Sequence, residues 1–394
     1  MWSQISSVIS MNIRSIPQRL WMSLATILAV AVVVAVLLAF LAMGNGFRTT
    51  LQGSGSDELA VLIRSGSQAE LNSVLSREQV NLIAESPGIA RDEKGPLISA
   101  ELYLIVDGIK KTTQGKANLP FRGIDERGLE LRKNVQLTQG RMFEPGKNEI
   151  VVGEAILREF AGFELGNIIK LGRAQWQVVG VFSAGGSVFE SELWADVRTV
   201  QGQFDRGNSF QIIRAKLATP GDVAPLEQTI KADQQRLNLD VSTEKAYYQE
   251  QSQGVGDLIF YLGWPLAIAM ALGALAGALN TMYNSVAQRA GEIATLRAIG
   301  FPGIPVFCGT LFESLALSLI GGLLGTMAAY LFFDGISTST LGSSFTQIVF
   351  RFDMNADVII NGMTLAAVIG VFGGFFPALR AARLPVLLAF AAAA

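Results

Sequence analysis

The stretch WMSLATILAVAVVVAVLLAFLAMGNGF, residues Trp21–Phe47, contains no charged side chain. A helix needs about 20 consecutive apolar residues to cross a bilayer, so this stretch predicts a membrane-spanning helix at 21–47. The apolar core of a cleaved signal peptide is shorter, about 7–15 residues, and a small-residue cleavage site follows it. No clear site of that kind follows residue 47. We therefore expect an uncleaved membrane anchor.

Three further stretches have the same character, at 258–282, 304–333 and 358–379. Within the third predicted span, Glu313 is the only charge. The 394-residue chain is 50% hydrophobic and 16% charged, whereas soluble domains carry about a quarter charged residues. With a net charge of −2 and no basic stripe, nothing indicates nucleic-acid binding. The chain has no histidine and a single cysteine, Cys308, which excludes an internal disulfide, a histidine-dependent triad and a His-ligated metal site.

The distribution of arginines predicts how the chain is oriented in the membrane, because loops on the cytoplasmic side carry an excess of Lys and Arg. Arginines without a matching excess of acids lie in segments 1–20, 283–303 and 380–394, at Arg14, Arg19, Arg289, Arg297, Arg380 and Arg383. The short 334–357 segment carries three aspartates against one arginine. We expect both termini and the 283–303 loop in the cytoplasm, with 48–257 and the short 334–357 loop outside.

Residues 48–257 predict a large extracytoplasmic α+β domain between the first and second spans. LSREQVNLIAESPGI (Leu75–Ile89) has a Ser N-cap and a Ser-Pro-Gly stop, which is typical of a helix. NEIVVGEAILREFAGFELGNIIKLG (Asn148–Gly172) has the pattern of a strand, a helix, a turn and a strand, and VAPLEQTIKADQQRL (Val223–Leu237) that of a further helix. A polar stalk at 244–256 should lead into the second span. The acids Asp125, Glu126, Glu154 and Glu190 have no catalytic spacing, and we interpret them as surface charges.

The loop QRAGEIATLRAIGFP (Gln288–Pro302) predicts a short helix between the second and third spans. Ile293, Leu296 and Ile299 recur at helical spacing and form one apolar face. Gly300 is expected to cap the helix, and Pro302 prevents its continuation. From composition alone, this helix is either a docking element or an interfacial helix whose arginines set topology.

Two features inside the third span stand out. Glu313 is an ionisable residue within an apolar helix, which makes it a candidate for function, although a structural carboxyl hydrogen-bonded to a neighbouring helix is the alternative. Gly321, Gly322 and Gly325 include a small-xxx-small pattern that lets helices pack closely.

Five stretches together resemble one family. The pattern R-x-x-E-I-x-x-L-R-A-I-G at Arg289–Gly300 is similar to the loop between spans two and three of MacB/FtsX-like ABC transporter permeases, the lipoprotein-releasing and macrolide-exporting type. Similar in the same order are Met11–Ala39, Gly140–Phe182, Phe312–Tyr330 and Phe375–Ala389. In this chain Leu384-Pro385 leads into an alanine-rich tail, where the family often continues with charged residues.

The resemblance implies that 283–303 is a coupling helix that docks on a separate ABC ATPase, with coupling positions at Arg289, Glu292, Ile293, Leu296, Arg297 and Gly300. It implies a multi-pass protein of the bacterial inner membrane with an amphipathic helix at 1–20 and a periplasmic core domain at 48–257. The chain itself is expected to have no catalytic residue, metal or cofactor, because ATP and Mg²⁺ are bound by the partner ATPase.

The functional unit implied by the resemblance has two ATPase copies and a second permease chain, identical or paralogous, within membrane lipid. Closure of the ATPase pair would move the periplasmic domains by mechanotransmission, exporting or extracting a substrate from the periplasm or the outer leaflet with a periplasmic adaptor or substrate protein. A permease that transports nothing and activates a cell-wall hydrolase remains open as an alternative. A simple anchored receptor is disfavoured by the coupling helix.

Overall fold

The structure, a computed structural model, describes residues 2–15, 19–342 and 346–384, with only the backbone of residues 254–260. The chain divides into two units. The helical unit comprises Met1–Asn45, Leu258–Ile336 and Phe352–Ala394, and the large domain comprises Gly46–Asp257 and Ser337–Arg351.

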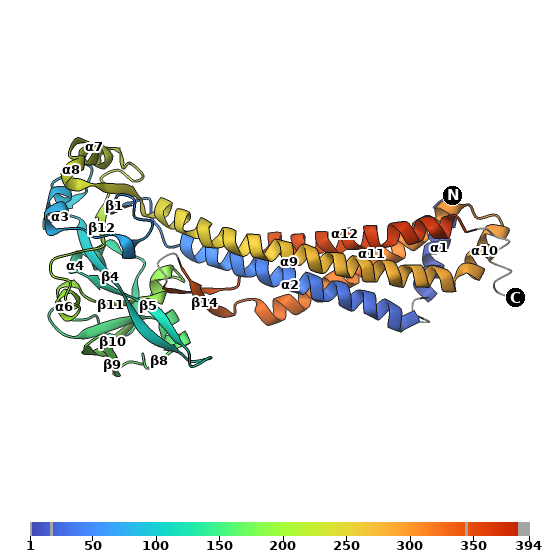
Figure 1. Cartoon of the computed structure of the whole chain (residues 1–394), viewed down its shortest axis with the longest axis horizontal. Helices are drawn as coiled ribbons and strands as arrows, with labels where there is room; N and C mark the ends of the chain where they lie inside the picture. Colours follow the sequence, from blue (N-terminus) through green and yellow to red (C-terminus); the bar gives the residue numbers. More distant parts are fainter. Residues whose placement is uncertain (1, 16–18, 343–345, 385–394) are drawn as a thin grey trace. The chain divides into compact units, whose positions relative to one another are not determined.

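The helical unit is built from long helices that run beside one another (Figure 1). Its helices are α1 (Trp2–Ser15), α2 (Leu20–Gln52), α9 (Glu244–Gln288), α10 (Ala290–Ala298), α11 (Gly303–Phe333) and α12 (Ala356–Ala382). The last residues of α2, from Gly46, and the first residues of α9, up to Asp257, belong to the large domain. In the described chain four helices are long and apolar enough to cross a membrane, namely α2, α9 from Tyr261, α11 and α12. The expected spans 21–47, 304–333 and 358–379 lie inside α2, α11 and α12, and the expected span 258–282 begins three residues before Tyr261.

Small residues allow these helices to approach closely. A Cβ added to Gly321 of α11 would lie 2.7 Å from the carbonyl oxygen of Ile27 in α2, and Gly325 faces the backbone of Ala31 one turn further on. Gly322 faces Ala366 of α12 instead. Lipid tails are as apolar as these side chains, so the hydrophobic effect does not hold membrane helices together. Close backbone packing of this kind stabilises their association instead.

The large domain contains a mixed sheet that, over the described residues, has 11 strands. The strand order along its main path is β13-β1-β12-β4-β5-β11-β7-β10-β6, with β8 paired to β4 and β9 to β10. The strands are β1 (Leu59–Arg64), β4 (Ile98–Lys110), β5 (Lys116–Ile124), β6 (Gln136–Gly140), β7 (Glu149–Gly153), β8 (Phe160–Ala161), β9 (Ile168–Leu171), β10 (Ala174–Ser183), β11 (Leu193–Asp196), β12 (Ile212–Lys216) and β13 (Leu239–Thr243). A separate two-stranded pair is β2 (Arg91–Asp92) with β3 (Gly95–Pro96).

Short helices cover this sheet. They are η2 (Glu70–Asn72), α3 (Arg77–Ala84), α4 (Glu126–Leu131), α5 (Glu154–Glu159), η3 (Val188–Ser191), α6 (Val197–Gln203), α7 (Ala224–Ala232) and α8 (Gln234–Leu237). The predicted cap at Ser76 is present as a full capping box with Gln79. The helix expected over Val223–Leu237 breaks into α7 and α8 because Asp233 leaves the helical conformation, with φ −131° and ψ 54°.

The segment expected as a short loop at 334–357 contains a β-hairpin. Its strands are β14 (Ser337–Leu341) and β15 (Gln347–Arg351), and both belong to the large domain. The backbone N–H of Val349 donates to the Ser191 hydroxyl at 2.9 Å, and the Tyr103 and Thr346 hydroxyls are 3.1 Å apart. Val349 is part of the domain's apolar core.

The two faces of the central strands differ in polarity. Because side chains alternate along a strand, Leu102, Phe121 and Ile213 point into the apolar core, whereas Glu101, Arg122 and Arg214 lie on the opposite face. All three of these charged side chains are almost completely buried.

The buried face holds a network of three arginines and four glutamates. Arg122 binds both carboxylate oxygens of Glu192 at 2.6 and 2.7 Å, and its Nη1 donates to Glu70 and Glu101. Glu101 also pairs with Arg132 and Arg214. Buried charges are tolerated only when they are paired in this way.

The network also holds the first turn of α9. The Nε of Arg214 donates to Glu244, the first residue of α9, at 3.0 Å, and its Nη2 donates to the Tyr248 hydroxyl at 3.0 Å. The Tyr247 hydroxyl accepts from the backbone N–H of Glu70 at 3.2 Å. The start of α9 is therefore fixed to the sheet by ion pairs and hydrogen bonds that water does not screen.

We expect Arg122→Met to lower the stability of the large domain by about 3–5 kcal/mol, because Glu70, Glu101 and Glu192 would keep buried charges without their main partner. Pulse proteolysis of the full chain in urea measures the change. The matched control is Arg236→Met, whose exposed pair with Glu78 should contribute less than about 1 kcal/mol. Equal effects of the two substitutions would contradict the role of the network.

The same network predicts acid sensitivity. Burial alone would raise the pKa of Glu101, but Arg132, Arg214 and Arg122 outweigh it, and the pKa lies well below its usual range. The pKa of Glu70 is lowered in the same way by Arg122 and Arg214. Both folded-state pKa values are depressed. The two carboxylates therefore contribute their full stabilisation of the large domain above the unfolded-state pKa of about 4.3, and this stabilisation is lost as the pH falls below that value. In the Arg122→Met variant, the free energy of unfolding should therefore fall less steeply as the pH is lowered.

Candidate functional site

Helix α10 forms where the sequence predicts it, and a glycine ends it. The backbone N–H of Gly300 donates to the carbonyl of Arg297 at 3.2 Å, and that of Phe301 donates to the carbonyl of Leu296 at 3.0 Å. Gly300 has φ +102°, which an L side chain rarely adopts. This is the Schellman arrangement, and Pro302 then precedes α11 as its N-cap.

One face of α10 packs into the helical unit. Ile293 is 3% exposed and lies in a small apolar cluster with Val286, Val306 and Ala381. These three residues come from α9, α11 and α12. The short helix therefore rests on the ends of three long helices.

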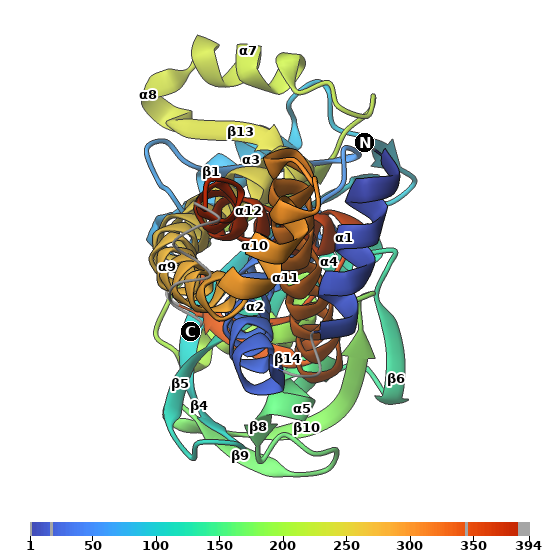
Figure 2. The same cartoon turned by 90° about the vertical axis from the view of Figure 1, so that its right-hand side faces the viewer.

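A buried arginine fixes the beginning of α10. Arg289 is 5% exposed, and its Nη1 donates to Glu313 of α11 at 3.2 Å. Its Nε donates to Glu292 at 3.1 Å, and its Nη2 donates to the side-chain oxygen of Asn12 in α1. Arg289 thus connects α10 to α1 and α11. Figure 2 labels these three helices.

Glu313 also faces a second cation. The Nη1 of Arg19 lies 3.8 Å from Glu313 and donates to the Ser285 hydroxyl near the end of α9. Arg19 and Arg289 therefore both face the buried carboxylate of Glu313. Glu292, at the surface, supplies a second carboxylate to Arg289. We call Asn12, Arg19, Ser285, Arg289, Glu292 and Glu313 the Arg289 cluster. Its formal charges balance.

Arg297 closes the other end of α10. Its Nη1 donates to the carbonyl oxygens of Ala382 and Leu384, both at 2.9 Å. Ala382 is the last residue of α12, whose final carbonyls have no partner inside the helix. A cation at a helix C-terminus also interacts favourably with the helix dipole.

The opposite face of α10 remains exposed. Thr295, Ala298, Ile299 and Gly300 are open to solvent, and 69% of Ile299 is exposed. The Glu292 side chain is 53% exposed. A large apolar side chain is therefore exposed just beyond the end of a helix whose other face is buried.

The family follows from comparison with known proteins. Residues 23–233, more than half of the chain, match the MacB-like periplasmic core domain, and residues 265–386 match the FtsX-like permease C-terminal domain. The chain belongs to the MacB/FtsX-like ABC transporter permeases. With its four apolar helices, this permease is a multi-pass membrane protein of the bacterial inner-membrane type.

Relatives of the permease have two lengths. An uncharacterized ABC transporter permease of Methanocaldococcus jannaschii is 20% identical over 97% of this chain and 96% of its own length. A macrolide export ATP-binding/permease protein MacB of Paracoccus denitrificans is 24% identical over 92% of this chain, but over only 55% of its own length. The chain thus spans about half the length of the MacB relatives. The periplasmic region of MacB from Actinobacillus actinomycetemcomitans aligns with 50% of this chain and 92% of its own, at 15% identity and a TM-score of 0.37.

The structure separates the predicted coupling positions of the permease into two groups. Arg289, Ile293 and Arg297 point into the protein, where they hold α10 in place. Leu296 is half-buried, and Glu292 and Gly300 are exposed. Because the inward side chains have their partners inside the permease, any direct contact with an ATPase falls to the exposed face.

Sequence reasoning missed the other members of the Arg289 cluster. Asn12, Arg19 and Ser285 lie far apart in the sequence, and Arg19 reads simply as a topology signal. The interpretation of Glu190 as a surface charge was wrong. Its carboxylate is buried and accepts from the backbone N–H groups of Ala184 and Gly186. Among the described residues, no group of three or more acidic or Cys side chains could hold a metal ion.

We expect Glu313→Gln to loosen α10, because Arg289 and Arg19 would be left without their buried counter-charge, at a cost of about 3–5 kcal/mol. In a Cys308→Ser background, maleimide labelling of Ile293→Cys should become at least about tenfold faster. Glu292→Gln is the matched control, since it removes the exposed carboxylate of the same cluster and should change labelling little. If both variants label alike, Glu313 does not hold the helix.

Proposed function

We propose that this permease is the non-catalytic membrane subunit of an ABC transporter whose ATP and Mg²⁺ are bound by a separate ATPase. The exposed face of α10 carries the proposal, because a short helix held at one end by the buried Arg289 and at the other by the half-buried Arg297 can transmit force without bending. Two ATPase copies would dock on two permease chains. The termini and α10 would then lie in the cytoplasm, as the arginine distribution predicts.

Mechanotransmission is the mechanism that we propose. Helix α9 runs from Glu244, held in the network of the large domain, to Gln288, directly before Arg289. The single helix α9 thus connects Glu244, which is held in the large domain, to the start of α10. Movement driven by ATPase closure would reach the large domain through α9, and would export or extract a substrate from the periplasm or outer leaflet with an adaptor or substrate protein.

Export is favoured over activation of a cell-wall hydrolase by the relatives, since MacB of Paracoccus denitrificans is a macrolide export protein. The second permease chain would contact α2. Leu20, Leu24, Leu28 and Val32 recur at four-residue spacing on this helix, and each is 41–59% exposed. Such a stripe forms one helix face, which we assign to the partner permease, with lipid around the remaining exposed surface.

We expect Thr295→Arg with Ile299→Arg to abolish co-purification of the partner ABC ATPase, because two arginine side chains would replace the small and apolar side chains of the exposed docking face. Membrane insertion should be unchanged, since neither residue is buried. Thr49→Arg with Ile168→Arg is a matched control in the large domain, where Ile168 is 66% exposed. Normal ATPase binding by the α10 variant would overturn the docking assignment.

We expect a Gly-Ser run inserted after Gln253 to uncouple the large domain from ATP hydrolysis, because such chains behave as random coils and do not transmit displacement. Spin labels on Thr113→Cys, in a Cys308→Ser background, report the distance between two permease chains. This distance should change with the bound nucleotide, and the insertion should abolish the change. ATPase binding should persist. The same run inserted after Gly221, in an exposed turn, is the control. A retained distance change with the stalk insertion would argue against transmission through α9.

A further inference from the structure

The buried network of the large domain contains one more carboxyl group than it has cations. Three guanidinium groups face four carboxyl groups, those of Arg122, Arg132 and Arg214 against Glu70, Glu101, Glu192 and Glu244. None of these seven residues is more than 6% exposed. With every carboxyl group ionised, three positive charges would oppose four negative charges. A buried charge without a partner is costly, and an acid in that position takes up a proton instead.

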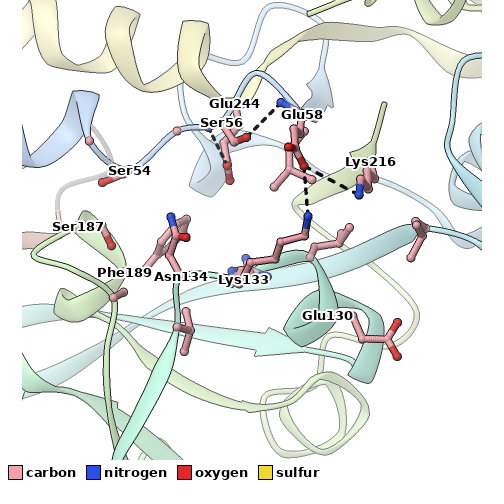
Figure 3. A pocket seen from close by; sticks show the side chains of 18 residues that line it. Ser54, Ser56, Glu58, Glu130, Lys133, Asn134, Ser187, Phe189, Lys216 and Glu244 are labelled. Carbon is pink, nitrogen blue, oxygen red and sulfur yellow. Dashed lines mark hydrogen bonds and ion pairs between the residues drawn. The ribbon is translucent and has the colours of Figure 1, made fainter. Parts of the chain in front are cut away.

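The described side chains beside the network do not supply a further positive charge. The Glu244 carboxyl group lies in the wall of a cavity of about 240 Å³, whose lining belongs to the large domain (Figure 3). Apart from Glu244 and Arg132, the charged side chains of the lining are Glu58, Glu130, Lys133 and Lys216. Two acids and two bases balance, and Figure 3 shows Glu58 facing both lysines, at 3.5 and 3.9 Å. The cavity therefore leaves the excess negative charge of the network uncompensated.

Three of the four carboxyl groups are closely paired with arginines. Glu101 pairs with all three guanidinium groups of the network, and Glu70 pairs with two of them. Glu192 accepts two hydrogen bonds from Arg122, at 2.6 and 2.7 Å, and a third from the indole Nε1 of Trp194 at 2.7 Å. Close cations and hydrogen-bond donors favour the ionised form of an acid. These three groups are therefore the carboxylates of the network.

Within the described chain, Glu244 is the least paired of the four carboxyl groups. Its Oε1 accepts from the Nε of Arg214 at 3.0 Å, but the same guanidinium also donates to Glu70 and Glu101. Of the described groups, only the backbone N–H of Ser56 reaches its Oε2, at the long distance of 3.3 Å. A proton is therefore best placed on Oε2. Burial raises the pKa of Glu244 in spite of Arg214, in agreement with this geometry.

We propose that Glu244 carries a proton in the folded large domain and that this proton holds the first turn of α9 on the sheet. The proton exchanges with water in the cavity, which reaches the surface at the exposed side chains of Glu58 and Lys133. When the proton leaves, the network gains a negative charge, which water stabilises better than a buried site does. Since Glu244 is the first residue of α9, its carboxylate gains that water when this turn detaches. The proton site is independent of ATPase docking and of transport.

The site determines how release of this turn depends on pH. In the released turn Glu244 faces water and has the ordinary pKa of a glutamic acid, about 4.3. Below that value the carboxyl group is protonated in both states, and the stabilisation of the attached turn is complete. Above it only the attached state keeps the proton, so the equilibrium constant for release rises by up to about tenfold per pH unit until the attached state also ionises. Glu70 and Glu101 have lowered pKa values, so they titrate at lower pH and do not offset this rise.

Labelling of a buried thiol near the start of α9 measures the release. Ser252 is 0% exposed, and Ser252→Cys in a Cys308→Ser background places a thiol of similar size there. We measure its rate of reaction with maleimide in the full chain and divide it by the rate of a free thiol at the same pH. This ratio should rise by up to about tenfold per pH unit from about pH 5 upwards. In Glu244→Gln it should stay low and constant, because glutamine imitates the protonated acid.

Glu58→Gln is the matched control for this labelling. It removes a carboxylate of the same cavity whose side chain is 49% exposed, and the rise with pH should persist. A ratio that is independent of pH overturns the hold of the proton on α9, and so does a rise that is equal in Glu244→Gln. The first of these outcomes needs no substitution at Glu244, so it decides even if the glutamine variant is unstable.

Infrared spectroscopy detects the proton directly, because the carbonyl stretch of a protonated carboxyl group is separate from the bands of carboxylates. The full chain is measured at about pH 5.5, above the ordinary pKa of a glutamic acid, in dodecyl maltoside, which has no ester carbonyl. The difference between the parent and Glu244→Gln should contain one protonated-carboxyl band. Other acids cancel in this difference, including Asp125, whose pKa burial also raises. Glu58→Gln should give no such band, and its absence from the Glu244→Gln difference overturns the protonation of Glu244.

Discussion

The guanidinium of Arg289 determines how α10 is placed. A buried charge must be paired, and its partners come from α1, α10 and α11, so these helices cannot separate without leaving a charge exposed to an apolar interior. The apolar contacts of Ile293 alone would let a nine-residue helix slide or tilt, since they have no direction. The ion pairs supply that direction, and the exposed face of α10 is the result.

Similar chemistry occurs at the other end of α9. Glu244 begins this helix inside the network of Arg122, Arg132 and Arg214, and Arg289 follows directly after its last residue. Within the network, burial raises the pKa of Glu244 despite its pairing with Arg214, whereas the pKa of Glu101 is lowered. Of these two carboxylates, Glu244 accepts a proton more readily.

Sequence patterns predicted the parts of this structure that local or length rules determine. The four spans follow from bilayer thickness, and the end of α10 follows from Gly300 and Pro302. Three kinds of feature could not be predicted. Charged residues such as Glu101 and Arg214 sit in strands where alternation suggests a solvent face, and tertiary packing of η2, η3 and the start of α9 covers them. Asn12 meets Arg289 through tertiary packing. Ser337–Leu341 (STSTL) has no alternating hydrophobicity, so its strand pairing was invisible.

The hairpin β14–β15 makes the large domain discontinuous in sequence. Its Val349 and Phe350 are 5% and 2% exposed, and Phe350 packs edge-on against Phe47 at the end of α2. A fragment cut at residues 46 and 257 would lack these side chains and would expose the apolar surface that they cover. The domain is completed only after α11 has been synthesised. During biosynthesis its final packing must therefore wait until the third span has been made, which links the folding of the soluble part to the order of membrane insertion.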